Sequence, residues 1–100
     1  MSRYHIVLDR LTMAMGFFDI RDSVSHYTPE ALKESVDFRL RGIEDILAHP
    51  GAKRIIRSIQ RSKINELRGD VRFILKELFA RDNGLYKECQ TKYYDLLRRL

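Results

Sequence analysis

The amino-acid sequence predicts an all-α protein, a small single-domain bundle of about four helices over residues 1–100. Three observations support this prediction. Apolar residues recur at helical spacing over most of the chain. Proline and glycine at 49–51 and a turn at 82–84 divide that pattern into helix-sized segments. A chain of 100 residues is long enough for one modest hydrophobic core and no second one.

The N-terminal segment, read as a helix, is apolar on two nearly opposite sides. One side carries Tyr4, Val7, Leu8, Leu11, Met15 and Phe18. A helix of this kind is buried between partners, and a domain this small does not supply both. We therefore predict an oligomer interface on the second side, in a homodimer or against another protein, at Ile6, Met13, Phe17 and Ile20. A short strand at 4–8 is the alternative, and residues 21–27 form a polar connection.

The second helix begins after Thr28, which is a favourable N-cap. Pro29 suits the first helical position, and Glu30 interacts favourably with the positive end of the helix dipole. One face of this helix is apolar and carries Leu32, Val36, Leu40, Ile43, Ile46 and Leu47. His49-Pro50-Gly51 ends the helix, because proline moves the preceding residue out of the α region.

The third helix is predicted over residues 52–80. Its apolar side carries Ile56, Ile64, Leu67, Val71, Ile74 and Leu78, and its acids lie on another side. Gly69 costs about 1 kcal/mol relative to alanine inside a helix, so the sequence leaves open a kink or break at 62–69.

The last helix is predicted to follow a turn at Asp82-Asn83-Gly84. Its apolar face carries Tyr86, Cys89, Tyr93, Leu96, Leu97 and Leu100. Arg98 and Arg99 suit its negative C-terminal end.

Charge is divided unevenly between the two halves of the chain. Residues 1–50 carry six Lys or Arg and eight Asp or Glu, which makes −2. Residues 51–100 carry thirteen Lys or Arg and six Asp or Glu, which makes +7. Residues 46–65 contain five Lys or Arg and no acid. Such a basic half predicts an anionic partner, which is nucleic acid, an anionic membrane or an acidic protein.

The cations of the third helix fall on one side of it. At about 100° per residue, six of them lie within an arc of about 100°. Ser58 and Asn65 add hydroxyl and amide groups suited to phosphate or ribose oxygens. We call the predicted nucleic-acid-binding surface the basic stripe, and it comprises Lys53, Arg54, Arg57, Ser58, Arg61, Asn65, Arg68, Arg72 and Lys76.

The basic stripe predicts sequence-independent binding to the phosphate backbone of duplex RNA or DNA. Arginine predominates in it, and the forked guanidinium suits phosphate oxygens. Two modes are open: a helix-turn-helix that inserts Arg54, Arg57 and Arg61 into the major groove, or a helical face laid across RNA phosphates and 2′-hydroxyls. Tyr94 points off the apolar face of its helix, and a single ring is not a stacking platform.

A helical protein–protein interaction module is the alternative from another functional class. Such an adaptor or inhibitor would dock the basic stripe on an acidic partner surface and self-associate through its N-terminal segment. A basic face that is merely solvated is the third interpretation.

Catalytic and metal-binding patterns are missing from the sequence. His5, His26 and His49 have no second ligand or base at a useful spacing, and paired cysteines, HExxH and Gly-rich phosphate loops are absent. We therefore predict a non-enzyme without cofactor or metal.

The single cysteine, Cys89, cannot form an internal disulfide, which favours a reducing, cytoplasmic location. The longest uncharged apolar run, 11–18, is shorter than the roughly 20 residues of a membrane span, so no membrane partner is predicted.

Overall fold

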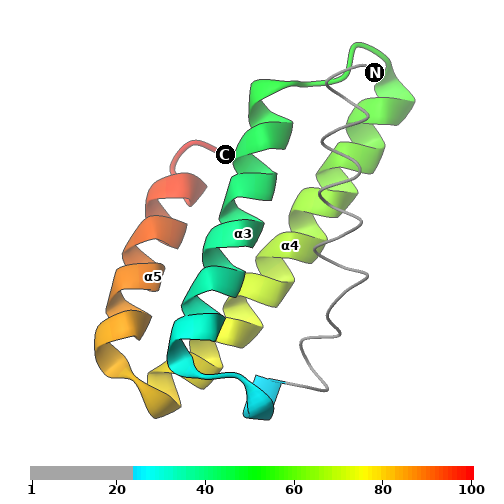
Figure 1. Ribbon diagram of the computed structural model, residues 1–100. Coiled ribbons are helices and arrows are strands. Elements are labelled where there is room, and N and C mark those ends of the chain that lie inside the picture. The colour runs from blue at the N-terminus through cyan, green and yellow to red at the C-terminus, as the bar shows by residue number, and fades with distance from the viewer. Residues whose placement is uncertain (1–23) are drawn as a thin grey trace.

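The computed structural model describes residues 24–100, which form one short 3-10 helix and three α-helices (Figure 1). These are η1 (Val24–His26), α3 (Pro29–Ala48), α4 (Arg54–Arg81) and α5 (Asn83–Leu97). Residues 24–100 contain no strand, so the predicted all-helical class is confirmed for this part of the chain. The structure shows three α-helices there, fewer than the four predicted for the whole chain. The predicted first helix, its strand alternative and the interface at Ile6, Met13, Phe17 and Ile20 lie outside the described residues.

The two ends of α3 follow the prediction. Thr28 Oγ1 accepts a hydrogen bond of 3.1 Å from the amide of Ala31, and Pro29 opens the helix. The helix ends at Ala48, directly before the predicted break. That break is held by the side chain of Gln60, whose Oε1 accepts from Gly51 N at 3.0 Å and whose Nε2 donates to the His49 carbonyl at 3.1 Å. Gln60 is buried, although the sequence pattern marks no polar core residue here.

Gly51 is required for a close approach and not for an unusual backbone angle. No described residue has a positive φ, so Gly51 does not serve here by adopting a left-handed backbone conformation. A Cβ added at Gly51 would lie 2.2 Å from Cγ2 of Ile56. The absence of a side chain therefore lets the connection pack directly on the first turns of α4.

α4 is one uninterrupted helix from Arg54 to Arg81. It begins two residues later than predicted, and the break that the sequence leaves open at 62–69 does not occur. The predicted turn at 82–84 is correct in position but too long, because Asp82 alone separates α4 from α5. The amide of Asp82 donates to Leu78 O at 2.7 Å, and its Oδ1 accepts from Leu85 N at 3.1 Å. One residue thus caps both helices, and Asn83 and Gly84 belong to the first turn of α5.

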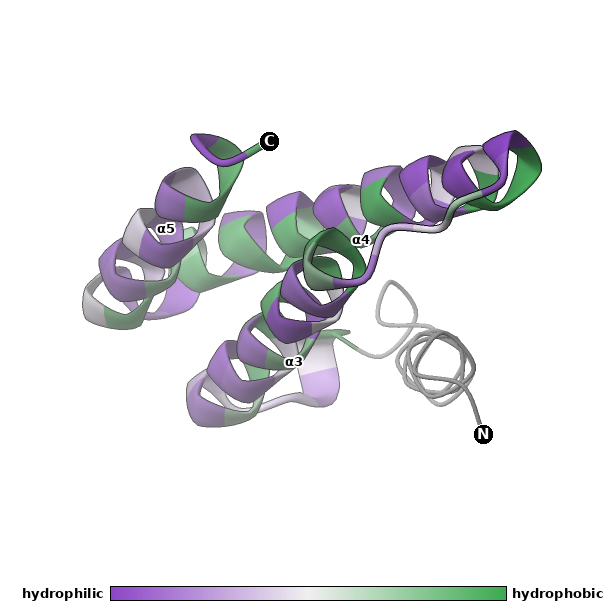
Figure 2. Cartoon of the chain, turned by 90° about the horizontal axis from the view of Figure 1, so that it is seen from above, coloured by the Kyte–Doolittle hydropathy of each residue, from purple (hydrophilic) through white to green (hydrophobic). Residues whose placement is uncertain are grey.

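The core lies between the three helices, and each of them contacts the other two. In the view from above, each of the three helices carries both hydrophobic and hydrophilic residues, as expected of amphipathic helices around a shared core (Figure 2). The fully buried core side chains include Leu32, Val36, Ile43, Leu67, Val71, Ile74, Leu78 and Cys89. Two residues predicted for apolar faces, Leu47 and Leu100, are exposed because they lie at helix ends that no neighbour covers.

One charged side chain is also part of this interior. Arg39 is only 1% exposed, and its Nε lies 3.4 Å from Oδ2 of Asp70 on α4. Its Nη1 also donates to the Ser35 carbonyl at 3.3 Å and to the Ser35 hydroxyl. A buried guanidinium needs such partners, so the acid side of α4 is used to hold α3.

Candidate nucleic-acid interface

The basic stripe runs along one side of α4. Because α4 continues through Gly69, the cations on either side of this glycine stay in helical phase. From Arg54 to Lys76 the stripe extends roughly 33 Å along the helix axis, at 1.5 Å per residue. All of its side chains are exposed except that of Arg68, which is half-buried.

The seven cations of the stripe make no ion pair with any residue in the described range. Most other cations in that range are paired. Lys33 reaches Glu88 at 3.0 Å, Lys92 reaches Asp37 at 3.3 Å, and Arg99 reaches Glu44 at 3.2 Å. The stripe is therefore a row of positive charges that the described fold leaves uncompensated.

The acids of α4 are engaged away from the stripe. Glu66 lies 3.5 Å from Lys63, Asp70 lies 3.4 Å from Arg39, and Glu77 lies 3.8 Å from Arg81. None of these three cations belongs to the stripe. The carboxylates on α4 therefore do not offset the charge of the stripe through direct contact.

The stripe also covers the first turn of α4, where positive charge is unfavourable. Lys53 occupies the N-cap position, makes no side-chain capping bond, and is followed by no acid in the first turn. The N-terminal end of a helix carries a partial positive charge, so cations there destabilise it and anions are attracted to it. The start of α4 thus favours an external anion.

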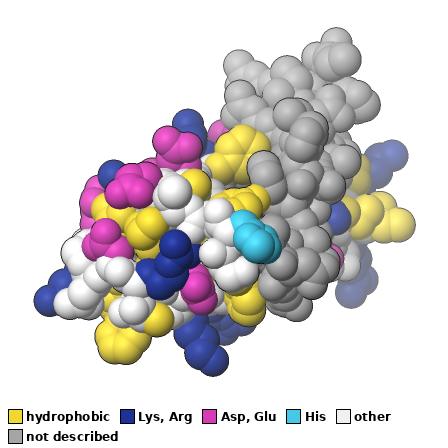
Figure 3. Space-filling model, turned by 60° about the horizontal axis from the view of Figure 1, so that its bottom comes forward, with side chains coloured by type: hydrophobic (Ala, Val, Ile, Leu, Met, Phe, Trp, Pro, Cys, Tyr) yellow, Lys and Arg dark blue, Asp and Glu magenta, His cyan; other side chains and the backbone are white. Residues whose placement is uncertain are grey.

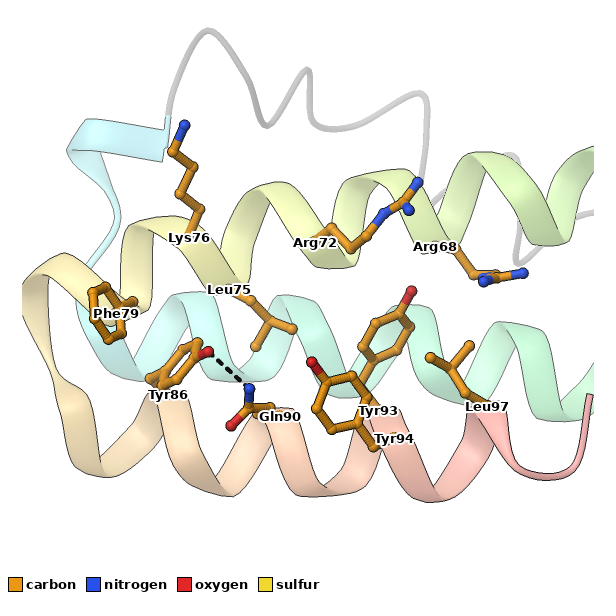
Figure 4. Close-up of a pocket in the computed structure, with 10 residues that line it drawn as sticks. All are labelled: Arg68, Arg72, Leu75, Lys76, Phe79, Tyr86, Gln90, Tyr93, Tyr94 and Leu97. Carbon is orange, nitrogen blue, oxygen red and sulfur yellow. Dashed lines mark hydrogen bonds between the residues drawn. The ribbon is translucent and has the colours of Figure 1, made fainter.

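A hollow of about 460 Å³ lies between α4 and α5 (Figure 4). Three stripe cations line it from α4, and three tyrosines and an amide line it from α5. The lining residues are Arg68, Arg72, Leu75, Lys76, Phe79, Tyr86, Gln90, Tyr93, Tyr94 and Leu97. Arg72 and Lys76 point away from α5, so their hydrocarbon stems face the hollow and their charges lie at its outer rim (Figure 4). We call this site the α4–α5 hollow.

A second hollow, of about 420 Å³, continues along the stripe toward the start of α4. Four stripe residues line it together with the end of α3, and Arg68 lines both hollows. These four residues are Arg57, Arg61, Asn65 and Arg68. Arg68 therefore lies between two neighbouring hollows that the stripe borders.

The aromatic cluster beside the stripe is a finding that the sequence prediction missed. Tyr94 is not the single ring expected, because the packing of α5 on α4 brings Tyr86, Tyr93 and Phe79 beside it. One signal for the cluster was present in the sequence. Phe79 follows Lys76 by three residues, and it therefore lies near the phase of the stripe.

Cys89 is buried in the core and carries a free thiol. Burial raises the pKa of this thiol to about 11, with a smaller contribution from the charge of Asp37. A neutral, buried thiol acts as a small apolar side chain. Within residues 24–100, no group of His, Cys, Asp and Glu is arranged to hold a metal ion.

None of the helices in the described part of the chain is long and apolar enough to cross a membrane. Comparisons of the chain with protein-family models, with curated proteins and with solved structures find no match.

Proposed function

We propose that this protein binds nucleic acid, and that the basic stripe contacts the phosphate backbone of duplex RNA or DNA independently of sequence. The single observation that carries the proposal is a row of seven cations, Lys53 at the start of α4 and six on α4 itself, that make no ion pair with any residue from 24 to 100. Cations elsewhere in residues 24–100 are mostly paired with acids, so a high content of Lys and Arg does not by itself explain the unpaired row.

Mutual repulsion within the stripe supports the same proposal. Like charges four residues apart on a helix destabilise it by about 0.2–0.5 kcal/mol per pair. Three such pairs lie within α4: Arg57 with Arg61, Arg68 with Arg72, and Arg72 with Lys76. A row of phosphates would relieve this repulsion, since each cation would then face an anion.

The length of the stripe favours a helical face laid along the backbone. A helix-turn-helix mode would use Arg54, Arg57 and Arg61 and leave the cations beyond Gly69 without a role. A face-on mode uses the full row. With four to six phosphates neutralised, the logarithm of affinity should fall with the logarithm of salt concentration at a slope of about −4 to −5.

The test is a salt titration of binding by the whole chain. Labelled duplex RNA, duplex DNA and single strands, each about 20 nucleotides long and so longer than the stripe, are measured by fluorescence anisotropy from about 50 to 300 mM salt. We expect a Kd below about 10 μM at the lowest salt, with the steep slope given above. Absence of binding to every probe at low salt would refute the proposal.

A matched pair of variants separates the stripe from net charge. Arg54→Gln/Arg57→Gln/Arg61→Gln and Lys33→Gln/Lys92→Gln/Arg99→Gln each remove three positive charges. The first set comes from the stripe, and the second comes from the ion pairs that join α3 to α5 and to Arg99 just after α5. The stripe variant should bind far more weakly, with a salt slope reduced by about 2.7 for duplex DNA. Equal loss in both variants would show that net charge, and not this surface, drives binding.

A protein–protein interaction module remains a second candidate because of one observation on the same helix. Ile55 is 68% exposed and Ile59 is 44% exposed, one turn apart on α4. Apolar side chains beside cations suit an acidic partner with an apolar centre. If Ile55→Ser/Ile59→Ser weakens nucleic-acid binding as much as the stripe variant does, the interface is not a phosphate-directed one.

A further inference from the structure

The α4–α5 hollow contains aromatic and amide side chains that a surface binding only phosphates does not need. Phosphates can be contacted by the exposed cations alone, yet Arg68, Arg72 and Lys76 share this hollow with four aromatic rings. The volume of about 460 Å³ lies within the range of small-molecule pockets, which is about 300–1,000 Å³. The inference below rests on the proposed function and concerns the form of the nucleic acid.

Two rings in the hollow present accessible surface, and each is held by a less exposed neighbour. Phe79 is 63% exposed and packs edge-to-face on Tyr86, with ring centroids 5.1 Å apart and an angle of 71°. Tyr94 is 50% exposed and stacks on the buried Tyr93, with centroids 6.0 Å apart and an angle of 28°. Rings that are already fixed lose little conformational entropy when another ring stacks on them.

Two polar side chains in the hollow, Gln90 and Arg68, have hydrogen-bonding groups that are not used within the described residues. Gln90 Nε2 donates to the Tyr86 hydroxyl at 2.8 Å, and this bond is drawn in Figure 4. The carbonyl oxygen of Gln90 then remains an acceptor that can face a ligand. Arg68 Nε is buried and has no hydrogen-bond partner among residues 24–100, which is costly for a charged donor. Because Arg68 lines the hollow, a rotation of its side chain would bring this donor to a ligand oxygen there.

Aromatic rings, amide groups and rim cations together match one nucleotide whose base is not paired. In a duplex each base face is covered by its neighbours, so a protein ring stacks only on a base that has left the stack. Every base has a π-face, so this contact tolerates any sequence. Arg72 and Lys76, whose charges lie at the rim of the hollow, are placed to meet the adjoining phosphates.

We propose that the α4–α5 hollow binds one unpaired nucleotide, with its base against Tyr94 or Phe79 and its phosphates on Arg68, Arg72 and Lys76. The preferred ligand is therefore a nucleic acid with an unpaired position next to a backbone that the stripe can follow. A single strand, a gap and a bulge all present such a nucleotide. A fully paired duplex binds through the stripe alone.

The first experiment compares three RNA probes of equal length: a single strand, a perfect duplex and a duplex with one bulged nucleotide. The bulged duplex should bind at least about fivefold more tightly than the perfect one, since stacking of one base is worth that much or more. Phe79→Leu/Tyr94→Leu should remove this difference and leave binding to the perfect duplex unchanged. Phe38→Leu is the matched control, because Phe38 is 39% exposed on α3 and lies outside the α4–α5 hollow.

A second measurement uses the hollow without the rest of the nucleic acid. Ring resonances of Phe79 and Tyr94 are followed by NMR during titration with a nucleoside monophosphate and, separately, with inorganic phosphate. We expect the nucleotide to shift both sets of resonances and phosphate alone to leave them in place. Equal shifts with both ligands would overturn the assignment of a base to the hollow. So would binding of an acidic peptide there in preference to the nucleotide.

The outcomes separate this inference from the proposed function. If the bulged and perfect duplexes bind equally and Phe79→Leu/Tyr94→Leu changes neither, the hollow has no role. The stripe variant and the salt slope would then still decide the proposed function. If no probe binds at low salt, both proposals fail together.

Discussion

Two regions of this protein use positive charge in opposite ways. On α3, Lys33, Asp37, Arg39 and Glu44 each meet an oppositely charged side chain on α4, on α5 or just after α5, and we call these residues the paired side of α3. On α4, the basic stripe makes no ion pair with any residue from 24 to 100. The surface seen in Figure 3 shows the first pattern, with acidic and basic side chains interspersed.

The difference extends to how the two long helices begin. α3 has a capping hydroxyl at Thr28, Pro29 at its first position and Glu30 in its first turn. α4 has Lys53 at the cap, no capping bond and no acid in its first turn. Local chemistry thus stabilises the start of α3 and weakens that of α4. A violation of local preferences of this kind is expected where residues serve binding and not the fold.

The largest effect on stability is expected at Asp70, the α4 residue that pairs with Arg39 on the paired side of α3. Asp70→Asn removes the carboxylate that faces the buried Arg39 guanidinium, whose side chain is 1% exposed against 18% for Asp70. The free energy of unfolding should fall by about 2–3 kcal/mol, measured by urea denaturation. Binding to nucleic acid should be unchanged at temperatures where the variant is folded. Lost binding with unchanged stability would reverse the roles assigned to the two regions.

The helix starts provide the next test, with effects of opposite sign. Thr28→Ala removes the capping bond to Ala31 and should cost about 1 kcal/mol. Lys53→Asp supplies α4 with an acceptor and a favourable charge and should add about 1 kcal/mol. Thermal melts measure both changes. Lys53→Asp should also weaken nucleic-acid binding, whereas Thr28→Ala should not. A Lys53→Asp protein that is more stable and binds equally well would remove Lys53 from the interface.

Local signals in the sequence account for much of the fold. Thr28, Pro29 and the break at His49-Pro50-Gly51 locate α3 because caps and proline act on neighbouring backbone. The start of α4 was misplaced by two residues, since Lys53 gives no capping signal. Gln60 was missed for a different reason. Its burial depends on a loop that passes over it, and a periodic pattern contains no information about that loop.

The candidate site also has one part that the sequence predicts and one part that it does not. The stripe is visible in the sequence because it depends only on the period of one helix. The α4–α5 hollow depends on how two helices pack, and the single-residue connection at Asp82 fixes which rings of α5 meet Phe79. The pairing of stripe and rings therefore requires the three-dimensional structure.

A smaller effect is expected at Gly69, which lies within the stripe's length but off its surface. A Cβ added there meets no other atom of residues 24–100 within 4 Å apart from the nearby backbone of its own helix, and α4 is helical on both sides of it. Gly69→Ala should therefore stabilise the protein by about 0.5–1 kcal/mol, because alanine loses less backbone entropy in a helix. Chemical denaturation measures this gain. Affinity for nucleic acid should stay the same, since the stripe is already in phase. A gain in affinity would instead show that α4 bends at Gly69 in the free protein.

The smallest effect concerns acid pH and the paired side of α3. A hydrogen bond from Lys33 and its positive charge lower the pKa of Glu88 below its ordinary value of 4.5. A carboxylate with a lowered pKa in the folded state stabilises the protein above its unfolded pKa, and this contribution is lost as pH falls through the folded pKa. Melting temperature should therefore decrease less on acidification from about pH 6 to pH 3 in Glu88→Gln than in the parent protein. Asp95→Asn is the matched control, because Asp95 pairs only with the neighbouring Arg98 in the described part of the chain.

The basic stripe has no carboxylate partner in residues 24–100 to protonate, so any acid-dependent loss of nucleic-acid binding should follow unfolding and not precede it. If binding is lost while the helices stay folded, a carboxylate must pair with the stripe cations, and their charge would then be compensated.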